Sequence, residues 1–388
     1  MTDRSPAATK IGDLAAVAGI RHVHVVAWRD LDDVEAGGSE LHAANVCREW
    51  AEAGLHITCR TSYAAGHPPD VVRDGYEVER RAGRYLVFPR AAVSAIAGRQ
   101  GRPDALVEIW NGMPFLSPLW SRVPRLTFVH HVHGAMWRMV LPRRLAAMGE
   151  TMERSIAPRI YRRSQIVTLS NSSKRELVEE LGFDDDRVAV VPPGVDARFT
   201  PGGARASAPT LVAVGRLVPP KRVDELIRAA AEARRSVPDL RLEIVGEGFE
   251  HVTLEALIAD LGADDWVELV GRCSDDELVR RYRRAWILAS ASSHEGWGMS
   301  VTEAAACATP AVVTDIAGHR DAVVNGVTGL LCDTPADLAP ALVELLTDHE
   351  RRERFGAAAR ERAAELTWPE TATSLMRLLA AESHRRTR

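Results

Sequence analysis

The sequence predicts an α/β protein made of two doubly wound domains, each built on a parallel β-sheet. With 388 residues, the chain is too long for one ordinary hydrophobic core, so two domains are expected. Short runs rich in Val, Leu and Ile alternate with amphipathic stretches of helix length, which is typical of parallel sheets in repeated strand–helix units. An aperiodic stretch rich in Gly, Pro, Ala and Ser, residues 196–209, interrupts this alternation.

The alternation places strands and helices in both halves of the chain. Strands are expected at residues 22–28, 106–109, 126–129 and 165–169, and then at 210–214, 240–245, 266–270, 287–290 and 311–314. Helices are expected over residues 41–53, 224–233 and 300–308, and over 351–382 with a break near Trp368 and Pro369.

These elements set the expected domain boundaries. We expect a frayed N-terminal tail (1–20), a first Rossmann-like domain (21–197), a linker (198–209), a second domain (210–368) and a C-terminal helix (369–388) that crosses back to the first domain. Ligands of doubly wound domains bind at the carboxyl ends of the strands, so functional residues are expected in the loops that follow them.

Composition and charge exclude several classes of protein. Hydrophobic residues make up 46% and charged residues 26% of the chain, as in ordinary globular proteins, and a net charge of −4 disfavours nucleic-acid binding. The five scattered cysteines lack CxxC spacing and are expected to be buried thiols in a reducing compartment. No apolar run reaches the ~18 residues of a membrane span and no signal peptide precedes residue 20, so a cytoplasmic location is expected.

One segment, residues 138–163, is strongly basic, with seven arginines against Glu150 and Glu153. Such a run is most often a solvated helix face. Because Trp137, Met139 and other apolar residues accompany it, contact with an anionic acceptor or with the inner face of a membrane stays open.

The most informative motif is residues 294–303, in which Glu295 and Glu303 flank a turn with Gly296 and Gly298 that opens into a helix. Unpaired N–H groups and the positive dipole end at such a helix N-terminus favour a phosphate. Each carboxylate can accept hydrogen bonds from the hydroxyls of a sugar or a ribose. The motif therefore predicts a site for a nucleotide-sugar.

A second motif supplies positive charge. Gly215 and Arg216 follow the expected strand 210–214, and Lys221 precedes the next helix. Gly215 permits a close turn. The planar guanidinium of Arg216 and the amine on the flexible Lys221 side chain can bind one anion together. A diphosphate held in this way is a good leaving group, because its developing charge is stabilised in place.

Two further glycine loops follow strands. Gly246 and Gly248 come after strand 240–245, but the full GxGxxG pattern is missing, so a nicotinamide or flavin cofactor is disfavoured. Gly37 and Gly38 lie between the first strand and the helix 41–53, and they predict a loop of the first domain that faces phosphate or sugar.

The histidines at 130, 131 and 133 close the strand 126–129. This tight spacing lacks an obvious partner carboxylate, so a metal site is disfavoured and one histidine is expected to face a ligand at the strand's end. Asp30 and Asp32 match the DxD pattern of some metal-dependent sugar transferases, but chance explains them better on a loop after the first strand. No metal is expected.

In this order and spacing, the motifs resemble those of glycosyltransferase family 4, a large group of retaining enzymes with the GT-B fold, in which two Rossmann-like domains face a central cleft. The resemblance covers roughly residues 22–380. It rests on GGSE (37–40), the histidines at 130–133, VVPPGVD (190–196), GRLVPPKR (215–222), VGEG (245–248), EGWGMSVTEA (295–304) and NGVTGLL (325–331).

The resemblance implies a role for each matching residue. Arg216 and Lys221 would bind the donor diphosphate, Glu303 the ribose hydroxyls and Glu295 the transferred sugar. Glycines and backbone amides would line the donor at Gly37, Gly38, Gly215, Gly246, Gly296, Trp297, Gly298, Met299 and Ser300. Trp297 would preserve an aromatic wall where the family often has Phe. His130 would lie near the donor sugar, although His131 also fits the register.

The implied reaction is sugar transfer from a nucleoside-diphosphate-sugar with retention of anomeric configuration, without a metal. The leaving phosphate itself would take the acceptor's proton, and closure across the hinge 196–209 would exclude water. A nucleotide-sugar 2-epimerase of the same fold and a non-catalytic nucleotide-sugar-binding protein are the alternatives.

Specificity is expected to depend on loops outside the motifs. Loops 246–250 and 271–275 would select the base, and segments 110–115 and 134–163 would form the acceptor walls. Cell-surface glycans, glycolipids and small glycosides are the product classes that such an enzyme makes.

Overall fold

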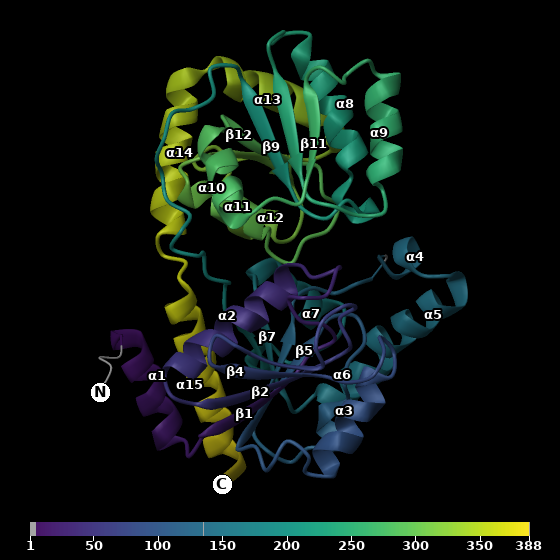
Figure 1. Cartoon of the computed structure of the whole chain (residues 1–388), viewed down its shortest axis with the longest axis vertical. Helices are drawn as coiled ribbons and strands as arrows, with labels where there is room; N and C mark the ends of the chain where they lie inside the picture. The colour runs from purple at the N-terminus through teal and green to yellow at the C-terminus, as the bar shows by residue number, and fades with distance from the viewer. Residues whose placement is uncertain (1–4, 135, 388) are drawn as a thin grey trace. The chain divides into compact units, whose positions relative to one another are not determined.

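The computed structural model describes residues 5–134 and 136–387, which divide into two compact units. The N-terminal unit holds the chain up to Gly194 together with the segment from Trp368 onwards, and the C-terminal unit holds Val195–Thr367. Figure 1 shows the chain leaving the N-terminal unit and returning to it through the last helix, α15 (Trp368–Thr387).

The N-terminal unit is built on an eight-stranded sheet with the strand order β3-β4-β2-β1-β5-β6-β7-β8. Its strands are β1 (His22–Val26), β2 (His56–Thr61), β3 (Asp70–Arg73), β4 (Tyr76–Arg80), β5 (Ala105–Trp110), β6 (Arg125–Val129), β7 (Gln165–Thr168) and β8 (Val188–Val190). Neighbouring strands are parallel, except that the edge strand β3 runs antiparallel to β4.

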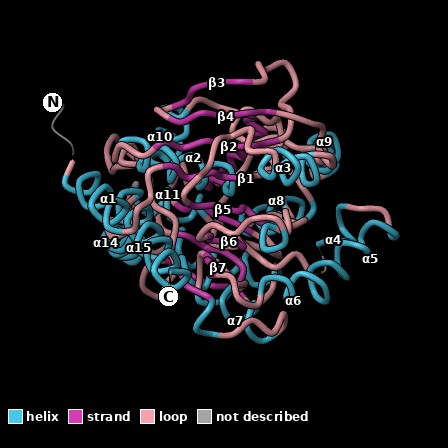
Figure 2. The backbone as a smooth tube through the Cα atoms, turned by 90° about the horizontal axis from the view of Figure 1, so that it is seen from below, coloured by secondary structure: helices cyan, strands magenta, loops and turns pink. Residues whose placement is uncertain are grey.

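Helices cover both faces of this sheet (Figure 2). The helices α1 (Pro6–Val17), α2 (Gly38–Glu52) and α15 pack with β1 and β2 in one apolar core, which includes Trp50 and Leu375. The opposite face is covered by α3 (Val87–Ile96), α6 (Ala157–Tyr161) and α7 (Asn171–Glu179). The short helices α4 (Met136–Val140) and α5 (Arg143–Thr151) precede a π-helical turn, Met152–Ile156, that leads into α6.

The C-terminal unit is built on a parallel six-stranded sheet with the order β11-β10-β9-β12-β13-β14. Its strands are β9 (Thr210–Val214), β10 (Arg241–Val245), β11 (Val267–Gly271), β12 (Ile287–Ser290), β13 (Ala311–Thr314) and β14 (Gly329–Cys332). Its helices are α8 (Val223–Arg234), α9 (His251–Asp260), α10 (Asp275–Arg284), α11 (Met299–Ala306), α12 (His319–Ala322), α13 (Leu338–Thr347) and α14 (His349–Ala363). One face packs on α8, α9 and α13, and α14 packs on α11.

The prediction of two parallel-sheet α/β domains is confirmed, and all nine expected strands are present within a few residues. Five strands were missed: β2, β3, β4, β8 and β14. The expected break in the C-terminal helix falls between α14 and α15.

The prediction of a frayed tail over residues 1–20 is wrong from Pro6 onwards, and residues 1–4 lie outside the described part of the chain. Residues 6–17 form α1, because Ser5 caps its first turn by accepting a hydrogen bond from Ala8 N (3.1 Å) and because Ile11 is fully buried in the core shared with α15. The cap and the buried stripe together stabilise the helix.

The segment 198–209 contains no helix or strand. The Arg205 guanidinium donates to the carbonyls of Ala285 (2.6 Å) and Arg283 (3.1 Å) and to Thr309 Oγ1 (2.6 Å). These contacts attach the segment to the C-terminal unit. Within the described residues, no helix is both long and apolar enough to cross a membrane.

Candidate functional site

The candidate site of the C-terminal unit lies where its sheet changes direction. The chain runs from β9 outward through β10 and β11 on one side, and then through β12, β13 and β14 on the other, so β9 and β12 flank the topological switch point. Open α/β sheets bind ligands there, because the loops that leave the two strands diverge. A pocket with about 370 Å³ of empty volume opens at this place, and its polar lining comes from Gly215, Arg216, Lys221, Ser290, Ser292 and Ser300.

The glycines of the 246–248 turn support the loop that carries Arg216. A Cβ atom on Gly246 would lie 1.9 Å from Gly215 O, and one on Gly248 would lie 2.1 Å from Leu217 O. Leu217 N donates to Glu247 O (2.9 Å), so the two loops pack backbone against backbone. Glycine is required at both positions for this close approach, which gives Gly246 a structural role in addition to the predicted place beside the donor.

Two residues predicted for the site, Lys221 and Glu295, form an ion pair. The Lys221 side chain is 25% exposed and the Glu295 side chain 16%, and Ser292 Oγ also donates to Glu295 Oε1 (3.0 Å). Burial alone would raise the pKa of the Glu295 carboxyl, but the charges of Lys221 and His319 and the two hydrogen bonds outweigh it, so this pKa is lowered. The site therefore holds a carboxylate that stays ionised at neutral pH beside an amine.

The turn before α11 is shaped by glycine and by a buried histidine. Gly298 has φ +91° and begins the helix, so the chain uses the left-handed region that glycine adopts without strain. A Cβ atom there would lie 3.1 Å from Cδ2 of His319, whose Nδ1 is 2.9 Å from Thr314 O. The Trp297 side chain is 5% exposed and packs inside the unit, and its predicted place beside the donor stays a prediction.

Glu303, one turn into α11, is held by a phenol from a neighbouring helix. Tyr282 Oη, which is fully buried on α10, donates to Glu303 Oε2 (2.8 Å). Burial raises the pKa of the Glu303 carboxyl to about 7, with Asp275 and Asp196 adding to the rise and Tyr282 and Arg198 opposing it. Near neutral pH, this carboxyl changes between an acceptor of hydrogen bonds and a protonated form.

The N-terminal unit has its own switch point, between β1 and β5. Gly37 and Gly38 begin α2 there, and Asn111 Nδ2, from the loop after β5, donates to Ser39 Oγ (2.8 Å). The Gly37 amide donates to the buried Glu40 carboxylate (2.9 Å), so it is already occupied. A ligand at this helix end would use other amides of the first turn.

His130 lies at the carboxyl end of β6 and is 5% exposed. Its Nε2 is 3.2 Å from His42 Nδ1, so one imidazole donates to the other. Burial lowers the pKa of His130 to about 4, and a neutral imidazole results at neutral pH. The neighbouring rings of His131 and His133 stack on each other with centroids 4.5 Å apart.

The remaining sequence candidates have structural partners. Asp30 and Asp32, the residues of the DxD pattern, form ion pairs with Arg80 and Arg73. Over residues 5–134 and 136–387, no group of three or more His, Cys, Asp or Glu side chains is arranged as a metal site. The five cysteines are free thiols.

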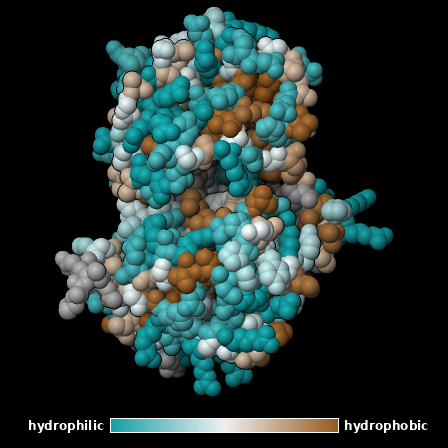
Figure 3. All heavy atoms as spheres, viewed as in Figure 1, coloured by the Kyte–Doolittle hydropathy of each residue, from teal (hydrophilic) through white to brown (hydrophobic). Residues whose placement is uncertain are grey.

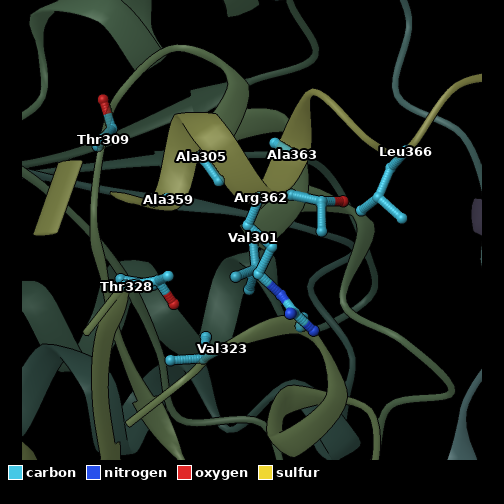
Figure 4. A pocket seen from close by; sticks show the side chains of 12 residues that line it. Val301, Ala305, Thr309, Val323, Thr328, Ala359, Arg362, Ala363 and Leu366 are labelled. Atoms are coloured by element: carbon cyan, nitrogen blue, oxygen red, sulfur yellow. The ribbon is translucent and has the colours of Figure 1, made fainter. Parts of the chain in front are cut away.

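A second pocket of about 280 Å³ lies behind α11, where α11 faces α14 (Figure 4). Small and apolar side chains line most of it, including Val301, Ala305, Ala359 and Ala363, while the Arg362 side chain donates to Asp321 O (2.7 Å). It contains none of the residues predicted for the donor. The pocket between β9 and β12, which Arg216 and Lys221 line, is therefore the candidate active site.

Sequence reasoning missed three residues that hold the site: Ser292, Tyr282 and His319. Ser292 and His319 each follow a strand's carboxyl end, at β12 and β13, and that position alone could have identified them. Tyr282 is a lone aromatic residue in the charged helix α10, and no local signal points from it to Glu303.

Comparison with known proteins agrees with the geometry. Residues 36–199 match the family model "Glycosyltransferase Family 4", and residues 197–362 match "Glycosyl transferases group 1". The chain is 35% identical to the D-inositol 3-phosphate glycosyltransferase of Nocardia farcinica, over 89% of this chain and 85% of that protein, and 31% identical to the one of Kineococcus radiotolerans, over 88% and 90%.

Similar folds occur among solved structures. Sucrose-phosphate synthase from Thermosynechococcus elongatus superposes with a TM-score of 0.78 at 19% identity, covering 92% of this chain and 97% of that one. Anabaena HepE, solved in complex with UDP and glucose, gives a TM-score of 0.73 at 16% identity, covering 93% of this chain and 100% of that one.

Proposed function

The chain belongs to glycosyltransferase family 4, and we propose that it is a retaining hexosyltransferase that moves a sugar from a nucleoside-diphosphate-sugar to an acceptor hydroxyl. The observation that carries the proposal is the Lys221–Glu295 pair beside the pocket at the β9/β12 switch point. This arrangement puts a cation for the diphosphate next to a carboxylate for the sugar hydroxyls.

Each donor group has a partner in this proposal. Arg216 and Lys221 bind the diphosphate, and the amides at the start of α11, around Gly298 and Ser300, add to the positive potential. Glu295 accepts from the sugar hydroxyls and Glu303 accepts from the ribose hydroxyls. In the N-terminal unit, Gly37, Gly38 and His130 stay the predicted donor-binding residues.

The chemistry follows from what these groups can do. Glu295 is paired with Lys221 and accepts a hydrogen bond from Ser292. These contacts lower its nucleophilicity, so it is suited to accept hydrogen bonds from sugar hydroxyls rather than to attack the sugar. We infer that the acceptor attacks the face from which the diphosphate departs, and that a phosphate oxygen takes the acceptor's proton. Charge develops on the leaving diphosphate, where Arg216 and Lys221 stabilise it. No step requires a metal.

The acceptor is proposed to bind the N-terminal unit at the loop after β5 and along the segment 134–163. Trp110, the last residue of β5, and Phe115 in the loop are buried, which leaves Asn111 and Met113 as the accessible residues within 110–115. The names of the two relatives favour a small phosphorylated polyol as the first acceptor to test, and the UDP in the Anabaena structure favours uridine nucleotides as the first donors.

The test is a turnover assay with a nucleotide-sugar labelled in the sugar. We expect release of the nucleoside diphosphate to depend on an added acceptor, and the product to keep the donor's anomeric configuration by NMR. A Lys221→Met variant should lose about 10²-fold in turnover. Wild-type turnover in that variant would contradict the assignment.

The same assay separates the other functions. A 2-epimerase would convert the labelled sugar to its epimer without any acceptor. A binding protein would retain the nucleotide-sugar unchanged with every acceptor.

A further inference from the structure

The helices α4 and α5 form a hairpin that projects from the rest of the N-terminal unit (Figures 1 and 2). We propose that this hairpin docks the protein on a membrane surface that contains anionic phospholipid. The inference concerns where the enzyme works and does not depend on the donor site.

The hairpin exposes a stripe of apolar side chains. Met139 is 47% exposed, Leu145 43%, Met148 56% and Ile156 41%. Leu145 and Met148 are one helical turn apart on α5, and Ile156 ends the π-helical turn that continues it. Single exposed apolar residues are ordinary, but several on one projecting element mark a surface that binds something.

The hairpin does not need this stripe for its own packing. Trp137, 6% exposed, lies against Gly149, where a Cβ atom would come within 2.7 Å of the indole ring, and Ala146 is buried. These residues fill the interface between α4 and α5. The exposed methionines and leucine are therefore additional to the contacts that hold the hairpin together.

Positive charge surrounds the stripe. Arg143 and Arg144 are exposed at the start of α5, and neither has an acidic side chain within ion-pair distance among the described residues. Arg138 is 74% exposed and pairs with Glu150 (2.7 Å). Figure 3 shows hydrophobic and hydrophilic side chains next to each other on the projecting arm.

Arginines beside exposed Leu and Met are suited to a lipid surface, which has a charged headgroup layer above an apolar layer of acyl chains. The guanidinium groups attract anionic headgroups, and the apolar side chains enter the boundary of the acyl chains, which interfacial helices penetrate by about 5–10 Å. Because the hairpin is convex, its tip suits entry into a headgroup layer better than enclosure of an acidic peptide. A membrane is therefore the occupant that the charge and shape favour.

The base of the hairpin is fixed to the loop that follows β6. Glu153, 2% exposed in the π-helical turn, accepts hydrogen bonds from His133 N (2.7 Å), Gly134 N (2.9 Å) and Trp137 Nε1 (3.1 Å). Burial raises the pKa of this carboxyl, and the three donors oppose the rise. The hairpin thus has a set orientation relative to the loop that carries His130.

Co-sedimentation of the full chain with vesicles tests the proposal. We compare vesicles of phosphatidylcholine alone with vesicles that also contain phosphatidylglycerol, at low and high salt. Wild-type protein should bind the anionic vesicles and be released by salt, because surface charge is screened. Failure to bind anionic vesicles at low salt would overturn the proposal and leave an acidic protein as the occupant.

Two hairpin variants and one control locate the surface. Each arginine near an anionic surface changes partition about fivefold, so Arg143→Glu with Arg144→Glu should reduce binding by about 25-fold or more. The variant with Leu145→Ser and Met148→Ser should keep salt-sensitive attraction but bind more weakly. The control, Arg99→Glu with Arg102→Glu, makes the same charge change at exposed positions before β5 and should bind like wild type.

Equal loss in the control and the hairpin variants, or no loss in either hairpin variant, would contradict a docking role for this hairpin. The variants change exposed side chains, and their melting temperatures should match that of wild type. The stabilisation of the C-terminal unit by a nucleotide should also be unchanged in all of them. If the donor proposal fails, a nucleotide will not stabilise the wild-type protein. That result does not depend on vesicle binding, so the two proposals are tested separately.

Discussion

Replacing Glu295 with glutamine should tighten the binding of a nucleoside diphosphate while it slows sugar transfer. In the free protein, the Lys221 amine is paired with the Glu295 carboxylate, so part of its interaction energy is already used. A diphosphate that binds in the pocket competes with Glu295 for the amine. The Glu295→Gln change removes the negative charge but keeps a group of similar shape that can accept hydrogen bonds.

The expected magnitude follows from the exposure of the pair. A hydrogen bond to a charged group contributes about 1.5–3 kcal/mol and a neutral one about 1 kcal/mol. With Lys221 25% and Glu295 16% exposed, solvent screens the pair and the lower end applies, so the difference is about 0.5 kcal/mol. This corresponds to a diphosphate dissociation constant about twofold lower in Glu295→Gln. Lys221→Met should raise it about 30-fold, since a charged contact of about 2 kcal/mol is lost.

Isothermal titration calorimetry with UDP, together with the turnover assay, measures both effects. We expect opposite changes in affinity in the two variants and lower turnover in both, because Glu295 also holds the sugar. Ser292→Ala is the control, because it removes the hydroxyl that contacts Glu295 and Ser290 but leaves both charges of the Lys221–Glu295 pair in place, so UDP affinity should change less than in the other two variants. If Glu295→Gln weakened UDP binding as much as Lys221→Met does, Glu295 would not compete with the diphosphate and the reasoning would be refuted.

Three further changes test other parts of the site. The ionised form of Glu303 accepts the ribose hydroxyls and its pKa is about 7, so the KM for the nucleotide-sugar should rise about tenfold one pH unit below that value, and Glu303→Gln should abolish this dependence. Tyr282→Phe removes a donor to the carboxylate, so the inflection should move to higher pH; an unchanged profile would contradict the contact. With the pKa of His130 at about 4, the Glu303→Gln enzyme should show no inflection between about pH 5 and about 8. Gly246→Ala, whose Cβ atom would meet a carbonyl oxygen at 1.9 Å, should lose about 2–4 kcal/mol of folding stability and the thermal response to nucleotide, whereas Gly83→Ala, with nothing within 4 Å, should keep both.

The strands were predictable where Val, Leu, Ile and Ala predominate. This holds for β9 and β12, and for β10, which has three such residues beside Arg241 and Glu243. The strand β2 was missed because it carries His56, Thr58 and Arg60, and its polar groups are satisfied by partners from other strands, such as His24 Nδ1, 2.8 Å from Thr58 Oγ1. Such pairing depends on the fold and leaves no apolar run in the sequence.

The edge hairpin of β3 and β4 was missed for a different reason. Its strands are half polar, as expected for an edge. The turn between them, Asp74 and Gly75, has positive φ at both positions, which is the pattern of a two-residue hairpin turn. The Asp-Gly pair could have identified it.

Some site residues could be predicted from their position in the sequence, whereas others depend on how distant helices pack. Arg216, Lys221 and Glu295 follow strands directly, so their placement at the carboxyl ends could be predicted from sequence. The contact of Tyr282 with Glu303 depends on how α10 packs beside α11, and no spacing in the sequence encodes that distance. The burial of the Trp297 side chain could not be predicted either, because a turn rich in glycine can bury an aromatic ring as well as present it.

The most direct test of the account is the melting temperature of the wild-type protein and of Lys221→Met with nucleoside diphosphates and their sugars. A ligand at a hundredfold excess over its dissociation constant stabilises a protein by about 2.7 kcal/mol, which shifts the melting temperature by several degrees. At least one nucleotide and its sugar should raise the melting temperature of the wild type, and Lys221→Met should lose most of this rise. No rise with any of them, or the same rise in the variant, would contradict a diphosphate site between β9 and β12.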